Sequence, residues 1–377
     1  MVHVQSYIQE ERVMAHLTNW IGIDDHADKL TIALYVGAQK QPAREWEVAP
    51  TEAGLRQLVR WLKELQGPVH CVYEAGPCGY ELYRLLVARK IDCVVAAPSL
   101  TPRKPGERIK TNRRDARKLA ELHRAGMLTV ITVPDRRQES VRDLLRARGD
   151  VRKNVLSARH RLSKFLLRHG RRYRDGSTWK AGHWSWIRSQ KMDEPHEQTV
   201  LAHYIAALEA LQEQLEALDA HVQEAAREAD YAPMVAQLCV LRGIDVLSAM
   251  IILAELGDLR RFASASQLMA AVGLVPSEYS TGDKTRRFAI TKTGNAHVRH
   301  VLVQAGWHYQ RAPRAGSVVR KRRAGQPDAV VAIARRADER LHRKYRRLVG
   351  RGKRSTVAVT AVARELAGFI WALGQQQ

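Results

Sequence analysis

Cysteine and long apolar runs are scarce in this chain, and each absence excludes a class of protein. The 377 residues include four cysteines, Cys71, Cys78, Cys93 and Cys239, and no two of them form a Cys-x-x-Cys pair. This spacing argues against a zinc ribbon or a disulfide framework and is typical of reduced core cysteines in a cytoplasmic protein. No apolar run approaches the roughly 18 residues of a membrane-spanning helix, so we expect no membrane segment. Residues 1–18 carry acids and lack a signal-peptide core, which predicts a flexible lead-in.

Acidic residues are also few relative to basic ones. The chain has 62 Lys and Arg against 39 Asp and Glu, which gives a net charge of +23 and a pI near 10.3. Between Lys284 and Lys353 there are 20 basic and 3 acidic residues, a net charge of +17. Such an excess favours a polyanionic partner, most often nucleic acid, over the alternative of a merely basic protein.

Hydrophobic alternation in the first third of the chain predicts strands, and apolar residues at helical spacing predict helices between them. Residues 20–36 predict two strands around a turn, 41–48 a third strand, and 69–73 and 91–96 two buried strands. Residues 52–65, 79–89 and 115–125 predict helices, the first capped by Thr51. Three strands followed by alternating helices and strands are typical of a mixed α/β sheet.

Three acids fall at the ends of these elements. Asp24 closes the first strand, Glu74 closes the fourth, and Asp115 begins a helix with Asn112 one turn before it. Converging carboxylates repel unless they hold a cation, and oxygen ligands suit Mg²⁺ or Mn²⁺, which assist phosphoryl chemistry. The alternative is that each acid is an ordinary cap or surface charge. Asp25 and Asp28 lie close by, and Asp24 is preferred because it continues the alternation of its strand.

Two long helices of opposite charge are predicted next. Residues 138–169 form a basic amphipathic helix, and residues 195–229 form an acidic helix with a coiled-coil seam of about three heptads. That seam can pair with the basic helix or with another subunit. Between them, residues 171–190 interleave aromatic and basic side chains, which suits stacking on unpaired bases or, alternatively, a local aromatic core.

The remaining residues, 231–377, are predicted to be helical, with a basic loop over 312–326. Leu241–Ile244 resembles the turn of a helix–hairpin–helix, although a plain helical turn fits equally well. Ser280 and Thr281 precede Gly282 and are followed by Lys284, Arg286, Arg287 and Lys292. Hydroxyls beside a glycine and several cations suit the holding and attack of a phosphodiester, and the alternative is an ordinary polar turn.

Five segments together resemble the DEDD-type insertion-sequence transposases, the family of the Piv DNA invertase and the bridge-RNA-guided recombinases. They are WIGIDDHADKL, CVYEAG, RIKTNRRDARKLAELHRAG, GLVPSEYSTGDKTRR and ITKTGNAHVRHVLVQAGWH. The resemblance implies an α/β RNase H/RuvC-like N-terminal domain over 19–137, coiled-coil helices within 138–230 and an all-α C-terminal domain over 231–377. It also implies a DNA recombinase of the bacterial or archaeal cytoplasm, associated with the nucleoid. A homo-oligomer, dimer or tetramer, would form through the coiled coil, and a structured guide RNA would specify the DNA.

By this resemblance Asp24, Glu74 and Asp115 correspond to the first, second and fourth acids of the family. The third acid falls at Asn112, which ligates Mg²⁺ without bringing charge, and the nucleophilic serine falls at Thr281, with Ser280 preceding it. Residues expected to bind nucleic acid are Arg113, Arg114, Lys284, Arg286, Arg287, Lys292 and Arg299. The alternatives are a RuvC-like junction nuclease and a catalytically impaired relic that binds nucleic acid. An actin-like ATPase is disfavoured because a second phosphate loop is missing.

Overall fold

The structure, a computed structural model, describes residues 18–102, 111–281 and 284–376, without the side chains of 280–287. Almost all of the predicted lead-in therefore lies outside the described residues. The chain divides into two compact units, the first ending at Val133 and the second beginning at Pro134. The predicted ranges 138–230 and 231–377 both fall in the second unit, and the boundary between them stays a prediction.

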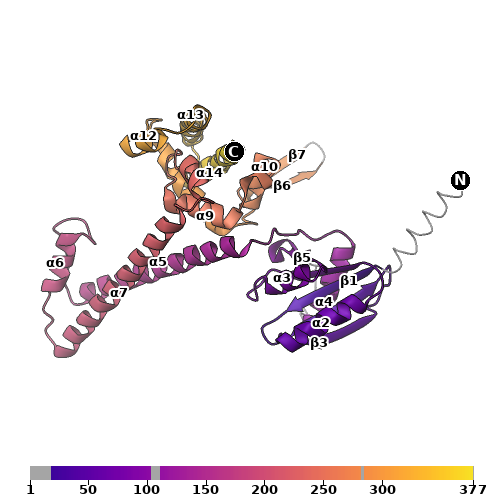
Figure 1. The fold of residues 1–377 in the computed structure, drawn as a ribbon. Coiled ribbons are helices and arrows are strands. Elements are labelled where there is room, and N and C mark those ends of the chain that lie inside the picture. Colours follow the sequence, from indigo (N-terminus) through magenta and orange to yellow (C-terminus); the bar gives the residue numbers. More distant parts are fainter. Residues whose placement is uncertain (1–17, 103–110, 282–283, 377) are drawn as a thin grey trace. The chain divides into compact units, whose positions relative to one another are not determined.

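Five strands form the sheet of the first unit (Figure 1). They are β1 (Asn19–Asp25), β2 (Leu30–Val36), β3 (Arg44–Val48), β4 (Val69–Glu74) and β5 (Asp92–Ala96), in the spatial order β3-β2-β1-β4-β5. β1 pairs antiparallel with β2 and parallel with β4, and β4 pairs parallel with β5. The predicted mixed α/β sheet is confirmed, and its parallel half places the carboxyl ends of β1, β4 and β5 at one edge.

Helices cover both faces of this sheet. On one face, α2 (Glu52–Glu64) and α3 (Glu81–Ala88) bury leucines against Ile21, Ile23 and Tyr73. On the other face, α4 (Asn112–Arg124) packs its small residues Ala116 and Ala120 against Ala33 and Tyr35. Because successive strand residues point to opposite faces, the alternating apolar residues of β1 and β2 supply both cores.

The second unit is built mainly of helices. They are α5 (Arg136–Arg168), α6 (Ala181–Ser189), α7 (Pro195–Ala225), α8 (Ala232–Leu238), α9 (Val246–Leu256), α10 (Ala265–Ala271), α11 (Ala296–Gly306), α12 (Ser317–Arg323), α13 (Asp328–Gly350) and α14 (Ser355–Gly374). Short 3₁₀ turns follow α9 and α11. The basic loop predicted over 312–326 contains α12, which sequence patterning missed because only seven residues form it.

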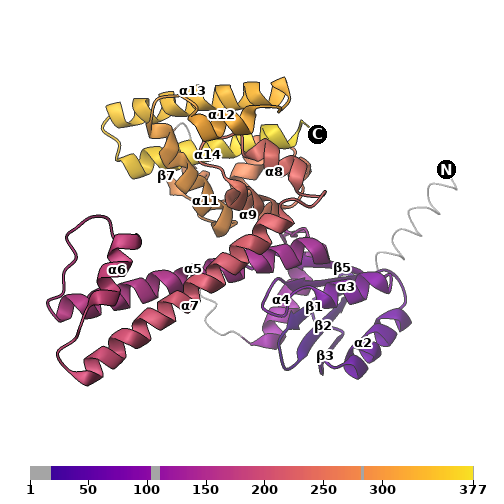
Figure 2. The ribbon, with the colours of Figure 1, turned by 60° about the vertical axis from the view of Figure 1, so that its left-hand side comes forward.

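The two long helices α5 and α7 lie side by side in both views (Figures 1 and 2). They run antiparallel, because Arg148 of α5 pairs with Asp219 of α7 while His169 after α5 pairs with Glu197 near the start of α7. Leu201 and Leu208 of the predicted seam are buried against Leu162 and Phe165. The seam therefore pairs with the basic helix of the same chain, the first of the two alternatives.

α14 is the one described helix long and apolar enough to cross a membrane by length and composition. In the most apolar stretch of this helix, 50% is buried in the core of the second unit. Val359, Val362 and Leu366 contact neighbouring helices there. Glu365, in the middle of the helix, pairs with Arg340 and Lys344 of α13. Packing in a core that α10, α11 and α13 share accounts for its apolar composition.

The prediction of an all-α C-terminal domain is wrong in one place. β6 (Pro276–Thr281) and β7 (Lys284–Ile290) form an antiparallel hairpin, visible beside α10 in Figure 1. Two residues, Gly282 and Asp283, join runs that contain β-branched and aromatic residues, which is a sequence signature of a two-residue hairpin loop. Ser280 and Thr281 of the predicted polar turn therefore belong to β6, and Gly282 lies outside the described residues.

Candidate active site at a sheet edge and a hairpin

Asp24 and Glu74 lie on the same face of the sheet at the ends of adjacent parallel strands. β1 and β4 pair in register, with Gly22 beside Val72 and Ile23 beside Tyr73, so the next positions along are Asp24 and Glu74. Val72 packs with Leu119 of α4, which identifies this face as the one that α4 covers. Both acids are half-buried. The strand pairing therefore brings two predicted metal ligands together.

α4 crosses this face with its first turn above the acidic edge. At the far end of the sheet, the Tyr35 hydroxyl donates to Glu121 at 2.8 Å, and Tyr35 is the β2 neighbour of Trp20. Two residues further along β1, a Cβ on Gly22 would lie 1.9 Å from the carbonyl oxygen of Ala116. Residue numbers along α4 thus decrease in the direction in which residue numbers along β1 increase. Continuing along β1 from Gly22 to Asp24 therefore leads to the helix turn that begins with Asn112 and contains Asp115.

Asp25 occupies a different environment, although it is adjacent to Asp24. The Cys78 thiol, before α3, donates to the Asp25 carbonyl at 3.5 Å. Burial raises the pKa of the Asp25 carboxyl, against a hydrogen bond with Cys78 and the charge of His26. Strand alternation directs Asp25 to the face opposite that of Asp24. The strand therefore separates Asp24 from Asp25, two of the three aspartates that the sequence offered as metal ligands.

The donor set at this edge suits a hard divalent cation. Asp24, Glu74, Asp115 and Asn112 offer carboxylate and amide oxygens from β1, β4 and α4, the ligand type that Mg²⁺ and Mn²⁺ prefer. In the part of the chain that the structure describes, however, no three His, Cys, Asp or Glu side chains are gathered closely enough to hold a metal ion. The backbone arrangement fits the ion, and its ligation stays a prediction.

The predicted hydroxyls lie in the second unit, at the tip of the hairpin. Ser280 and Thr281 end β6 and pair with Thr285 and Lys284 of β7. Their side chains, and those of Lys284, Arg286 and Arg287, lie outside the described residues. The choice between Ser280 and Thr281 as nucleophile therefore stays open.

Backbone hydrogen bonds tie the base of the hairpin to the helices on either side. The amide of Lys292 donates to the Gly273 carbonyl at 3.1 Å, and the amide of Asn295 donates to the Ala271 carbonyl at 2.8 Å. The amide of Thr291 donates to Val275 at 2.9 Å. The hairpin thus projects from the end of α10 and the start of α11 and is fixed at its base.

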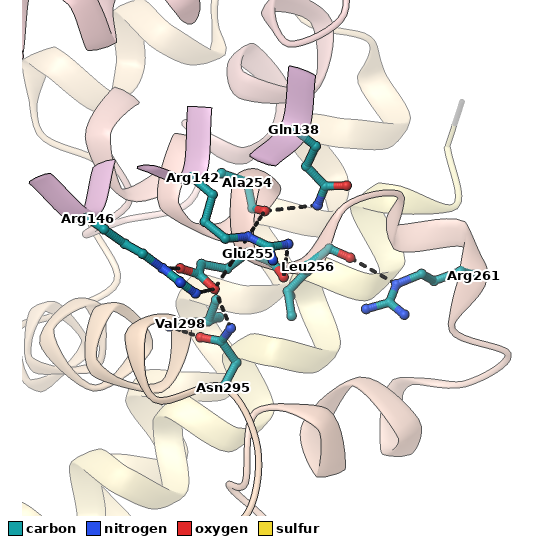
Figure 3. A network of polar contacts seen from close by, with 9 residues as sticks. All are labelled: Gln138, Arg142, Arg146, Ala254, Glu255, Leu256, Arg261, Asn295 and Val298. Atoms are coloured by element: carbon teal, nitrogen blue, oxygen red, sulfur yellow. Dashed lines mark hydrogen bonds and ion pairs between the residues drawn. The ribbon is translucent and has the colours of Figure 1, made fainter. Parts of the chain in front are cut away.

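A buried carboxylate connects this base to the long basic helix (Figure 3). Glu255 of α9, with 5% of its side chain exposed, accepts hydrogen bonds from Arg146 at 3.0 and 3.1 Å and from Asn295 at 2.7 Å. Asn295 in turn caps α11 by accepting from the Val298 amide at 3.0 Å. Burial raises the pKa of Glu255, but hydrogen bonds from Arg146 and Asn295 outweigh it and lower the pKa overall. The network holds α5, α9 and α11 in one arrangement behind the hairpin.

Comparisons with known proteins match the regions of the sheet and of the hairpin. A family model described as the transposase IS116/IS110/IS902 family matches residues 235–319, and a DEDD-type transposase model of IS110 elements matches residues 21–170. The putative transposase y4qE of Sinorhizobium fredii is 42% identical over 358 residues, which cover 95% of this chain and 88% of that protein. The transposase for insertion sequence element IS1533 of Leptospira borgpetersenii is 32% identical over 347 residues, covering 89% of this chain and 98% of that protein.

The chain belongs to the IS110 family of DEDD-type transposases. The resemblance inferred from the sequence motifs is thereby confirmed. One matched range begins within β1 and contains β4, α4 and the predicted acids, and the other contains the hairpin with the predicted hydroxyls.

The residues of this transposase that are predicted to contact nucleic acid differ in their exposure to solvent. Arg113, Arg114 and Lys292 are exposed, as a phosphate contact requires. Arg299 is half-buried and donates to the Val272 carbonyl at 2.9 Å, so it also supports the turn after α10.

The aromatic side chains of the connector between α5 and α7 pack against one another and against the core that these two helices share. The rings of His183 and Trp186 stack with centroids 5.7 Å apart, and Trp179 meets His183 edge-on at 5.0 Å. Arg159 lies over Trp179 and Arg188 over Trp184. The alternative of a local aromatic core therefore describes this segment better than a platform for unpaired bases.

Sequence reasoning missed a buried ion-pair cluster in the second unit of the transposase. Asp338 of α13 accepts from Arg242 at 2.9 Å and from Arg323 at 2.7 Å, and 4% of the Asp338 side chain is exposed. A signal was present, because Asp338 falls on the apolar stripe of its helix, four residues after Ala334 and three before Leu341. An acid at such a position indicates a buried partner, and Arg242 interrupts an apolar run in the same way.

Proposed function

We propose that this transposase cuts and joins DNA by attack of the Ser280 or Thr281 hydroxyl on a phosphodiester, at a site that Asp24, Glu74 and Asp115 complete. The observation that supports it most is the register of β1 and β4, with the first turn of α4 above their ends. Three acids that are distant in sequence would then lie together at one edge of the sheet, as a phosphoryl-transfer centre requires.

Asp24, Glu74 and Asp115 would hold Mg²⁺ or Mn²⁺, with Asn112 contributing its amide oxygen. The bound ion would supply Lewis-acid stabilisation of negative charge on the phosphate oxygens. Asparagine in place of a fourth carboxylate lowers the negative charge of the ligand set, so these residues would bind the ion less tightly than four carboxylates.

In the proposed step, the hydroxyl oxygen forms a bond to phosphorus and gives up its proton to a base, since a free hydroxyl is a weak nucleophile. The bridging DNA oxygen leaves and takes up a proton. Arg286 and Arg287 would stabilise the charge on phosphate, supported by Lys284 and Lys292. One phosphoester replaces another, so the strands can be rejoined without ATP.

A structured RNA and a second subunit belong to the same proposal. The charge of +23 and the exposed basic residues of α5 suit RNA as well as DNA. The acids lie in the first unit and the hydroxyls in the second, so the site can be completed within a chain or between chains of a homo-oligomer. Because the α7 seam already packs against α5, the oligomer would use other surfaces.

Asp24→Asn is expected to reduce recombination by roughly 10³-fold, because metal-assisted charge stabilisation contributes several kcal/mol to such reactions. The measurement is recombination of a plasmid pair with Mg²⁺, the co-purified RNA supplying the guide. Asp25→Asn is the matched control, since it removes the same charge one residue away on the other face of β1. Equal activity of the two variants would contradict the assignment of Asp24.

Ser280→Ala or Thr281→Ala is expected to abolish a covalent protein–DNA adduct on denaturing gels, and only one of the two should do so. Thr285→Ala, which removes another hydroxyl of the same hairpin, is the control and should keep the adduct. DNA cleavage without an adduct in the wild type would instead favour the junction nuclease, in which water attacks. An adduct that survives the double variant would also rule out both hydroxyls.

A further inference from the structure

A cavity of about 450 Å³ in the second unit has four arginines in its lining. It lies between the turn that precedes α9, the segment after α11 and the start of α12. Its ionisable lining residues are Arg242, Asp245, His308, Arg311, Arg314 and Arg322. With the histidine neutral, four arginines and one aspartate give this lining a formal charge of +3. Cations gathered around one hollow repel each other unless an anion lies between them.

Arg242, one of the lining residues, belongs to a buried cluster with an excess of positive charge. Arg242 and Arg323 share the single carboxylate of Asp338, and the exposed fractions of their side chains are 7%, 10% and 4%. The Arg242 guanidinium also lies over the Tyr309 ring, 4.8 Å from its centroid. Among the described residues, Arg242 Nη2 and the Tyr309 hydroxyl have no hydrogen-bond partner. The two arginines and one aspartate thus leave one net positive charge in a buried site, where neutralisation by an anion would stabilise the protein most.

The cationic groups differ in how firmly they are held. Arg242 Nη1 donates to the Ala312 carbonyl at 2.8 Å, and Arg322 Nη1 donates to the Ile244 carbonyl at 2.9 Å. These two therefore form a fixed wall. Arg311 and Arg314 are exposed and form no ion pair within 18–102, 111–281 and 284–376. Asp245, the acid in the lining, is occupied in capping α9 through the Ser248 amide.

We propose that this cavity binds a phosphate of the DNA backbone, held between the fixed guanidinium groups and closed over by Arg311 and Arg314. Guanidinium forks match phosphate oxygens, and the hollow leaves room for the adjoining sugar. This inference rests on the proposed function in taking DNA as the substrate. It adds a second contact with DNA, made by side chains other than those of the hairpin.

The test is the salt dependence of binding to a fluorescein-labelled DNA duplex, measured by anisotropy with the full chain. Each phosphate contact contributes about 0.9 to the slope of log affinity against log salt. The double variant R311Q/R314Q should therefore reduce the slope by about 0.9 if the cavity holds one phosphate. The variant R351Q/K353Q removes two exposed charges from the turn between α13 and α14 and should leave the slope nearer that of the wild type.

Two results would overturn the inference. Equal slopes for the two double variants would show that the charges act diffusely and that the cavity holds no particular phosphate. A reduced slope with a single-stranded RNA probe but not with the duplex would assign the cavity to RNA. Binding is measured without added divalent metal, so the slope does not depend on whether the catalytic proposal holds.

Discussion

Gly22→Val is expected to unfold the first unit or to detach α4 from its sheet. A Cβ at this position would lie 1.9 Å from the Ala116 carbonyl oxygen and 2.6 Å from the Ala120 amide nitrogen. Both atoms belong to the backbone, so no side-chain rotation relieves the clash, and the helix has to move away from β1. Ordinary overpacking costs about 1–3 kcal/mol, and a backbone clash this close should cost more than about 4 kcal/mol.

The loss is measured as the denaturation midpoint of the first unit in the full chain, together with hydrogen exchange of β1 and α4. Gly149→Ala is the control, because a Cβ there meets nothing within 4 Å and the residue lies inside α5. That change should stabilise the helix by about 0.5–1 kcal/mol. A Gly22→Val protein with native exchange protection in α4 would show that the contact between helix and sheet is looser than the structure has it.

The sheet of this transposase was predictable because its strands carry strong local signals. β1 and β2 are rich in apolar residues and mostly buried, and Glu74 ends a short apolar run, so hydrophobic patterning predicts the positions of these strands. The prediction that strand ends converge needed one further rule, that parallel strands end at one edge. The register that sets Asp24 beside Glu74 could not be read from the sequence, because it depends on pairing across 50 residues.

The hairpin and the ion-pair cluster were missed for different physical reasons. The hairpin's alternation is short and polar, so the glycine and the hydroxyls suggested a loop where β6 and β7 pair. The cluster joins Arg242 to Asp338 over 96 positions of the sequence. No local pattern specifies such a partner, because a buried charge shows only that some counter-charge must exist.

Asp338→Ala is the second change for which a large effect is expected, a loss of about 3–5 kcal/mol of stability in the second unit. The carboxylate is the shared partner of Arg242 and Arg323, so its removal leaves two buried guanidinium groups without a counter-ion. Truncation costs more than the net worth of the ion pairs, because the arginines stay desolvated after their partner is gone.

The measurement for Asp338→Ala is the denaturation midpoint of the second unit, with hydrogen exchange of α9 and α13. Asp328→Ala on the same helix is the control: Asp328 is exposed in the first turn and contributes through the helix dipole, about 0.3–1 kcal/mol. Replacing all three charged residues, as in Asp338→Leu with Arg242→Met and Arg323→Met, should recover part of the loss, since no charge is then left buried. If the single and triple variants were equally destabilised, lost packing rather than uncompensated charge would be the cause.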